Sequence, residues 1–410
     1  MMTIHKIDKK SLEKNYGKNI LPLSTFDNEN FIGSPPLEIL FFYKKNLPIF
    51  KLKESLLKTI HYYNLFSSRL IMIGDLKFAL QHCTDGAVAN DLRPVDACFD
   101  ESRFDEIRKE MVHVQTLPGE PLFAVTGIPF KNGILAGISC SHAVADGISL
   151  MLFLYAWMCI TDGKNFLPPS PQRLFQGPPV HFDPTDRTRV PPLSALGDKI
   201  RKKVEKDNVA EIFTATEYFT DDVLNEIKAE ARKEKYDISN HQIMTAFLLK
   251  KYHHKILPDT DRIVLKNPIN LRSIHPDIDP MYIGSANFNN FIRFTKEEID
   301  RLSMPQIACR IKKSIADVRN ESYAREIAHL SPCGIEINMA VFRRNRPPYS
   351  VETNIVSSNL THLNDLESML VGPETGSLLH IGLAVQTGFT MLKEKSGRIF
   401  AQITGRRPLI

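Results

Sequence analysis

Residues 133–159, GILAGISCSHAVADGISLMLFLYAWMC, join an apolar stretch, a short polar turn and a second apolar stretch. Residues 134–141 are apolar or small and follow the pair Asn132 and Gly133, which favours a tight hairpin turn, so we expect a buried strand there. From Ile148 onward, apolar side chains recur at helical spacing over about three turns, which predicts a core helix. His142 lies between these two rigid elements, a position that suits a reactive side chain.

The turn carries the spacing His-x-x-x-Asp, from His142 to Asp146, with Gly147 directly after it. A second copy of this spacing runs from His275 to Asp279. That copy is bounded by prolines, with no apolar strand before it and no helix after it, so we expect a solvated loop. The context, and not the spacing, therefore favours the first copy as a functional site.

The chain has 410 residues, which suits two domains of ordinary size. Its net charge is +5, and it has no dense basic run with interleaved aromatic residues, so we expect no nucleic-acid partner. The longest apolar run, 148–160, is shorter than the roughly 20 residues that span a bilayer, and residues 1–17 lack the apolar core of a signal peptide. The six cysteines form no CxxC pair, so we expect a reduced, cytoplasmic protein.

A proline-rich stretch separates two halves of the chain. Eight of the 26 prolines lie between Leu167 and Leu193, which disfavours both helix and central strand. We therefore expect an extended crossover at residues 166–205, between an amino-terminal domain at residues 1–165 and a carboxyl-terminal domain at residues 206–410. Strand and helix patterns alternate in both halves, which predicts an α/β fold class.

Several elements can be placed from local patterns. Residues 37–43 form an apolar run typical of a strand, and residues 52–63 carry a helical apolar face. Ser239 is followed three residues later by Gln242, a capping box that predicts the start of a helix. Three further strands are predicted, at residues 353–359, 380–390 and 398–404.

Taken in order, these motifs resemble the BAHD acyltransferases, within the wider chloramphenicol acetyltransferase-like superfamily. Residues 141–147, SHAVADG, and the helix after them resemble the HxxxD signature of the family. Further blocks that resemble the family occur in the same order at residues 21–27, 66–70, 182–187, 267–272 and 282–287. One block departs, because residues 367–373 lack the DFGWG segment of the plant members, and no tryptophan accompanies Ser357 and Ser358.

The resemblance implies a fold of two similar chloramphenicol acetyltransferase-like domains, mixed sheets with helices, and an active-site channel at their interface. It implies transfer of an acyl group from a coenzyme A thioester to a hydroxyl or amine of a small-molecule acceptor, within a ternary complex. Acyl-CoA would be a co-substrate, with no permanently bound cofactor and no metal. The family habit suggests a monomer.

Roles for particular residues follow from the chemistry and from the resemblance. A histidine with a reference pKa of about 6.5 is largely neutral near pH 7, so His142 can act as a general base. The tetrahedral oxyanion needs a donor, and the candidates are Ser357, Ser358 and Asn359, at the end of a predicted strand. The sequence leaves open which of the three points inward.

The remaining assignments concern support and binding. The resemblance implies that Asp146 pairs with Arg272 rather than with the histidine. Gly147 is expected to adopt a positive φ or to pack closely at the helix start. Ser239 and Asn287 are candidates for binding the cofactor, although Ser239 can equally be only a helix cap and Asn287 only part of a turn.

Two other functions remain open. A condensation-type enzyme that takes its acyl group from a carrier protein shares the HxxxD motif and lacks DFGWG, and a binding protein on the same scaffold would not turn over at all. A zinc site at His142 and Asp146 is disfavoured because no third ligand has suitable spacing nearby. His253 and His254 lie at a charged helix end and are expected to be solvated.

Overall fold

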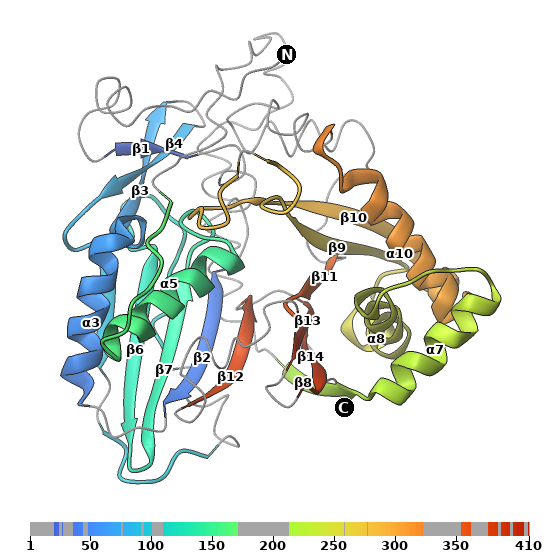
Figure 1. The fold of residues 1–410 in the computed structure, drawn as a ribbon, viewed down its shortest axis with the longest axis horizontal. Helices are drawn as coiled ribbons and strands as arrows, with labels where there is room; N and C mark the ends of the chain where they lie inside the picture. The colour runs from blue at the N-terminus through green and yellow to red at the C-terminus, as the bar shows by residue number, and fades with distance from the viewer. Residues whose placement is uncertain are drawn as a thin grey trace.

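The chain folds into two halves that lie side by side, each built on a β-sheet with helices packed against it (Figure 1). The computed structural model describes residues 20–23, 27, 36–43, 48–74, 77–91, 94–100, 110–170, 213–257, 259–276, 278–322, 354–361, 376–383, 387–393, 397–405 and 409. Most of the crossover expected at 166–205 lies outside the described residues, as does the segment at 367–373. The mixed sheets and helices confirm the predicted α/β fold class.

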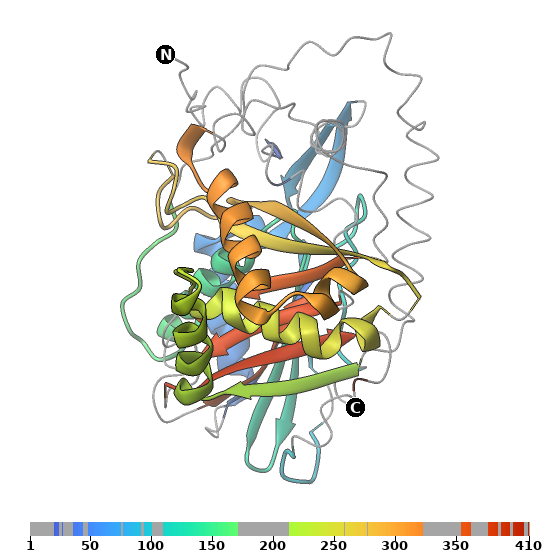
Figure 2. The same ribbon diagram turned by 90° about the vertical axis from the view of Figure 1, so that its right-hand side faces the viewer.

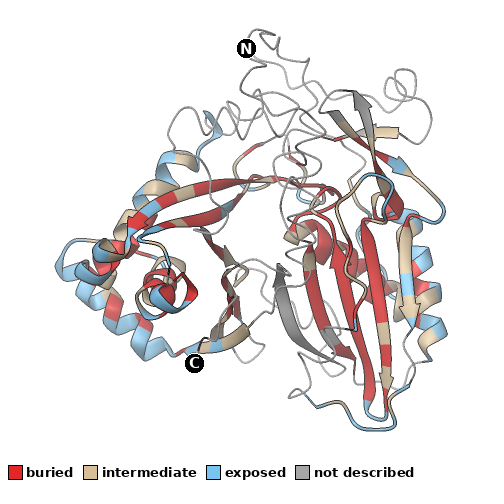
Figure 3. Cartoon of the chain, turned by 180° about the vertical axis from the view of Figure 1, so that it is seen from behind, coloured by how far each residue is buried: buried red, intermediate tan, exposed pale blue. Residues whose placement is uncertain are grey.

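The first half is organised around a five-stranded mixed sheet with the strand order β12-β2-β7-β6-β5. Its strands are β2 (Leu37–Tyr43), β5 (Ala87–Asp91), β6 (Phe123–Phe130), β7 (Gly133–Cys140) and β12 (Gly376–Leu383). Its helices are α3 (Ile49–Tyr62) and α5 (Gly147–Thr161), which share one hydrophobic core with β2, β6 and β7. Every residue of β7 is buried (Figure 3), as expected for a strand covered on both faces.

A smaller antiparallel sheet with the order β1-β4-β3 extends this half. Its elements are β1 (Ile20–Pro22), the short 3₁₀-helix η1 (Asn64–Ser67), β3 (Ser68–Gly74) and β4 (Lys77–His82). Phe66 of η1 is buried in the core of the first half, where its ring stacks on Phe153 of α5 at a centroid distance of 4.1 Å. The small sheet is thereby anchored to the helix that follows the His-x-x-x-Asp turn.

A tight hairpin joins β6 to β7 and sets the position of the His-x-x-x-Asp turn at the other end of β7. Phe130 pairs with Gly133, so Lys131 and Asn132 are the two turn residues. A Cβ atom at Gly133 would lie 2.2 Å from the carbonyl oxygen of Tyr43, so only glycine fits this position. The predicted hairpin is confirmed, with the glycine as the first residue of the strand after the turn.

The second half is organised around a six-stranded mixed sheet with the order β10-β9-β11-β13-β14-β8. Its strands are β8 (Phe213–Phe219), β9 (Arg262–Asn270), β10 (Asn287–Thr295), β11 (Asn354–Asn359), β13 (Gly388–Lys393) and β14 (Ile399–Gly405). Its helices are α7 (Asp221–Lys233), α8 (Asn240–Ile256), α9 (Lys296–Arg301) and α10 (Met304–Val318). Figure 2 shows α7, α8 and α10 in front of this sheet, with which they share a second hydrophobic core.

Helices of the second half begin at residues whose side chains cap them. Thr220 caps α7 by accepting from the backbone N–H of Val223. Ser239 and Gln242 form the predicted capping box at the start of α8. None of the helices in the described part of the chain combines the length and the apolar composition needed to cross a membrane.

One strand prediction is wrong in an informative way. The stretch 380–390 is not a single strand, because β12 ends at Leu383 and β13 begins at Gly388 in the other sheet. β12 pairs antiparallel with β2, so a segment from the carboxyl-terminal part of the chain completes the amino-terminal sheet. Local patterns do not show such a long-range pairing. The boundaries 1–165, 166–205 and 206–410 stay a prediction.

The only tryptophan of the chain fixes α5 to the core. Trp157 is buried, and its indole N–H donates to the carbonyl oxygen of Leu52 at 3.1 Å and to the hydroxyl of Ser55 at 3.0 Å. Both partners belong to α3, so the two helices are joined by polar contacts as well as by apolar packing. The turn at the start of α5 therefore rests on a rigid base.

Candidate active site

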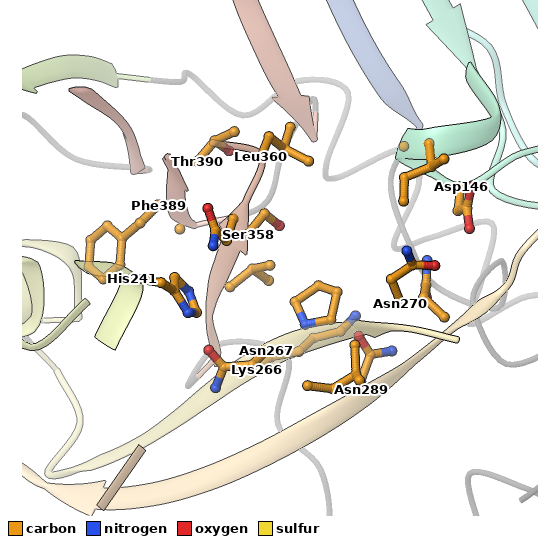
Figure 4. A pocket seen from close by; sticks show the side chains of 18 of the residues that line it. Asp146, His241, Lys266, Asn267, Asn270, Asn289, Ser358, Leu360, Phe389 and Thr390 are labelled. Atoms are coloured by element: carbon orange, nitrogen blue, oxygen red, sulfur yellow. The ribbon is translucent and has the colours of Figure 1, made fainter. Parts of the chain in front are cut away.

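A cavity of about 630 Å³ lies between the two halves and is lined by residues from both. The first half contributes the start of β2, His142 and the beginning of α5, and the second half contributes β9, β10, β11, β13 and the start of α8. Figure 4 shows Asp146 at one side of this cavity and the side chains of Lys266, Asn267 and Asn289 along the wall formed by β9 and β10. The cavity lies where the resemblance implies an active-site channel.

His142 lies two residues after the end of β7 and lines the cavity. Ser141 holds the backbone of the turn, because its hydroxyl accepts from the N–H of Ala143 at 3.1 Å and lies 2.7 Å from the hydroxyl of Thr116. From the other half, the hydroxyl of Ser285 donates to the carbonyl oxygen of His142 at 3.1 Å. The backbone that carries the histidine is thus fixed from both halves.

Burial lowers the pKa of His142 to about 4, and the positive charge of Lys266 acts in the same direction. The negative charge of Asp146 acts in the opposite direction but does not prevail. Since this pKa lies below the ordinary value of about 6.5, the ring is neutral at pH 7. A neutral imidazole at a cavity wall has a lone pair with which to accept a proton.

Asp146 and Arg272 form a buried ion pair between the halves. Nη1 of Arg272 lies 2.7 Å from Oδ2 of Asp146 and Nη2 lies 3.1 Å from Oδ1, a bidentate geometry. The side chain of Arg272 is only 5% exposed, and that of Asp146 is 2% exposed. The carboxylate also accepts from the backbone N–H of Ser149, as the N-cap of α5, and from that of Ala286. The ion pair that the resemblance implied is therefore present.

The ion pair belongs to a larger hydrogen-bond network. Nη2 of Arg272 also donates to the hydroxyl of Ser149 at 2.8 Å and to the carbonyl oxygen of Tyr282 at 2.9 Å. Burial by itself raises the pKa of Asp146, but the Arg272 charge and the hydrogen bonds outweigh it and hold that pKa below its usual value. Asp146 is therefore a carboxylate at pH 7 that joins the histidine turn to the segment after β9.

The expectation for Gly147 is wrong. Gly147 is absent from the glycines with positive φ, and a Cβ atom built on it meets nothing within 4 Å. It is the first residue of α5 and lines the cavity, so the space beside it belongs to the cavity. Glycine at this position keeps the wall open, and the backbone does not require it.

The three oxyanion candidates differ in direction. Ser357 is absent from the cavity lining, and its hydroxyl lies 2.9 Å from that of Thr245 and 3.3 Å from Nε2 of His241. Ser358 lines the cavity, as the alternation along β11 requires. Asn359 lines it too, but its amide oxygen accepts from Thr361 at 2.7 Å and at 3.1 Å.

Ser239 and Asn287, the candidates for cofactor binding, both line the cavity. Ser239 is also the helix cap of α8, with the backbone N–H of Gln242 donating to its hydroxyl at 3.4 Å. Capping uses one acceptor site of the hydroxyl, so the side chain has further hydrogen-bonding capacity. The structure thus places both candidates in the cavity wall without assigning them a ligand.

Sequence reasoning gave no individual role to three polar side chains of the cavity wall. Glu38 is buried on β2 and contacts Nδ1 of His113. Lys266 is also buried, and Asn267 is 1% exposed, with an amide group that makes no hydrogen bond to any described residue. All three lie in strands that are otherwise mostly apolar, and this break in the pattern is the signal that could have revealed them.

Two predictions about other histidines are wrong. His275, in the second His-x-x-x-Asp copy, is 1% exposed rather than solvated. The loop that follows β9 is not solvated throughout, because its apolar residues Ile278 and Tyr282 belong to a small core with Phe288 at the start of β10. His254 is exposed as expected, but the neighbouring His253 is buried.

A family model described as the Transferase family matches residues 10–364, which is most of the chain. The chain belongs to this family, the BAHD acyltransferases. The family membership agrees with the fold, the His-x-x-x-Asp turn and the Asp146–Arg272 pair, all of which the resemblance implied from the sequence.

Relatives of this BAHD acyltransferase share little sequence with it. An uncharacterized acetyltransferase of Arabidopsis thaliana is 23% identical over 58% of this chain and 53% of its own length, so the match spans about half of that relative. The spermidine sinapoyl-CoA acyltransferase of Arabidopsis thaliana is 24% identical over 80% of this chain and 76% of its own length. TRI101 of F. sporotrichioides, solved with coenzyme A and T-2, is 14% identical, covers 94% and 95% of the two chains, and superposes with a TM-score of 0.65.

Removing one partner of the Asp146–Arg272 pair is expected to destabilise the protein strongly. Asp146→Ala or Arg272→Ala leaves a buried unpaired charge, which lowers the free energy of unfolding by about 3–5 kcal/mol. Urea unfolding followed by circular dichroism measures this change. The control is Glu54→Ala, which breaks an exposed ion pair with Lys58 and should leave stability nearly unchanged. An Asp146→Ala variant with unchanged stability and lost activity would point instead to a direct catalytic role.

Proposed function

We propose that this BAHD acyltransferase transfers an acyl group from a coenzyme A thioester to a hydroxyl or amine of a small-molecule acceptor. One observation carries the proposal: His142, neutral at pH 7, lines a cavity that both halves of the chain form. A cavity of about 630 Å³ is in the range of small-molecule sites. Coenzyme A and T-2 in TRI101, and the CoA thioester named for the Arabidopsis relative, support a donor of the same class.

In the proposed reaction His142 is the general base. The acceptor O–H or N–H gives its proton to the imidazole as the acceptor attacks the thioester carbonyl carbon. The tetrahedral intermediate then breaks its C–S bond, and the imidazolium returns the proton to the departing thiolate of coenzyme A. Donor and acceptor react directly in a ternary complex. No acyl-enzyme is needed because the thioester is already activated.

We further propose that Ser358 stabilises the oxyanion of this intermediate. Ser358 lines the cavity, whereas Ser357 does not, and the hydroxyl of Ser357 contacts Thr245 and His241. A hydroxyl donor aimed at the developing negative charge lowers the barrier to its formation. Acyl-CoA enters only as a co-substrate in this scheme.

Polar groups in the wall offer binding positions for the substrates. Asn267 lines the cavity, and its amide group has no hydrogen-bond partner among the described residues. Such an amide can donate to and accept from a bound substrate. We assign Asn267 to substrate recognition, and we keep Ser239 and Asn287 as candidate contacts of the coenzyme A arm.

Replacing the base is expected to abolish turnover without abolishing donor binding. His142→Ala should bind acyl-CoA esters with unchanged affinity in calorimetric titration, while its kcat falls by about 10²- to 10⁴-fold. Release of free thiol from acyl-CoA in the presence of a panel of alcohols and amines measures kcat. An active His142→Ala variant would refute the general-base role. Failure of the folded wild type to bind any acyl-CoA would favour a carrier-protein donor or a scaffold without catalysis.

The pH dependence of kcat/KM should report the low pKa of His142. The base is active when neutral, so the rate falls only as the pH drops through the pKa of about 4. Lys266→Met removes a positive charge that contributes to this low pKa, so the acid limb should move to higher pH. Initial rates in overlapping buffers measure both profiles. If kcat/KM of the wild type instead fell around the ordinary histidine pKa of about 6.5, that result would contradict the buried setting of His142.

The two neighbouring serines provide a matched pair of variants. Ser358→Ala should lower kcat by about 10²- to 10³-fold, as expected for the loss of one oxyanion donor, with little effect on stability. Ser357→Ala should lower the melting temperature, because Thr245 loses a buried partner, and should change kcat little. The reverse pattern would assign the oxyanion to Ser357.

A further inference from the structure

Two histidines and an aspartate meet at the contact of α8 with α9, outside the lining of the cavity. His253 and His254 lie in the last turn of α8, and Asp300 lies in α9. Nε2 of His253 is 3.2 Å from Oδ1 of Asp300, and Nε2 of His254 is 3.1 Å from Oδ2. The ligand atoms of all three residues lie within 4.8 Å of one another.

We propose that His253, His254 and Asp300 bind a divalent transition-metal ion of the zinc type. Two imidazoles and a carboxylate are ligands that Zn²⁺ takes in proteins, with metal–ligand bonds of about 2.0–2.2 Å. In a tetrahedron with such bonds, ligand atoms lie ~3.3 Å apart. The distances of 3.2 Å and 3.1 Å from the histidines to the carboxylate are close to this value.

The hydrogen bonding of His253 fixes which nitrogen faces the site. Its Nδ1 lies 2.7 Å from the carbonyl oxygen of Leu249, which can only accept, so Nδ1 carries a proton. In the neutral ring Nε2 then carries a lone pair, which is directed toward a carboxylate oxygen of Asp300. Histidines that bind metals commonly donate their other ring nitrogen in this way.

Two potential acceptor atoms, Nε2 of His253 and Oδ1 of Asp300, lie 3.2 Å apart. Nε2 of His253 is buried and forms no hydrogen bond with a described residue, although Oδ1 of Asp300 is near. A divalent ion satisfies both acceptors at once.

The surroundings allow an ion to enter and to stay. The side chains of His254 and Asp300 are 59% and 55% exposed, so the site opens to solvent and leaves a coordination position for water. The carbonyl end of α8 carries partial negative charge, which favours a cation there. The opposing charge is Lys250, whose ammonium group donates to the backbone carbonyl oxygens of Ile299, Asp300 and Leu302 and holds the end of α9 in place.

The proposed ion would stabilise the fold and has no part in the transfer reaction. Its ligands come from two helices that pack against each other, so the ion would join the end of α8 to α9. The three residues are absent from the cavity lining, and the catalytic proposal does not depend on them. Binding and activity can therefore be tested separately.

The test is a calorimetric titration with Zn²⁺. The full chain is first treated with a chelator. We expect saturable binding of about one ion per chain, and a rise in melting temperature when Zn²⁺ is present. Loss of a hydrogen-bond partner of a metal ligand typically weakens metal affinity by about 10- to 100-fold. Loss of a ligand itself, in Asp300→Asn or His254→Gln, should therefore weaken Zn²⁺ binding at least tenfold. Both side chains are exposed, so these variants keep the core intact.

His61→Gln is the matched control, because His61 is an exposed histidine of α3 in the other half. Its Zn²⁺ affinity and melting shift should equal those of the wild type, and all these variants should retain acyl transfer. The proposal is overturned if the wild type shows no saturable binding. It is also overturned if Asp300→Asn and His61→Gln bind alike, since the ion then occupies unrelated surface groups.

Discussion

The buried contact between Asp146 and Arg272 is the interaction on which the arrangement of the cavity depends. It crosses from the first helix turn after β7 to the segment after β9, so it fixes one half of the molecule against the other. A buried ion pair contributes little net stability compared with apolar packing, but loss of one partner is costly because the other charge stays buried. In this acyltransferase the pair holds the backbone of His142 at the junction, where Ser285 of the second half reaches it.

Much of the fold could be predicted because its signals are local. The strand at 37–43, the hairpin before β7 and the capping box of α8 each depend on residues adjacent in the sequence. The pairing of β12 with β2 could not be predicted, because hydrophobic periodicity says that a strand exists but not which strand lies beside it. The same reason explains the error at His253, whose burial depends on how α9 packs against α8.

The residues of the candidate site, like the fold, could be predicted only in part. His142, Asp146 and Arg272 could be named because their spacing and order resemble a family. The cavity brings His142 and Asp146 together with Ser358, and Arg272 holds Asp146. The sequence could not separate Ser357 from Ser358, because alternation along a strand gives two faces without saying which one meets the cavity. Lys266 was not predicted, and Asn267 was named only within the block 267–272, since the burial of both side chains is not displayed by a single sequence.

The antiparallel pairing of β12 with β2 also bears on how the chain is made. β2 is completed early in synthesis, yet its outer neighbour does not exist until residue 383 has been added. During that interval the first sheet presents an open edge, the kind of surface that pairs with other chains. Closure of this edge by a late segment means that the two halves mature together, and a fragment carrying only the first half would lack the strand that seals it.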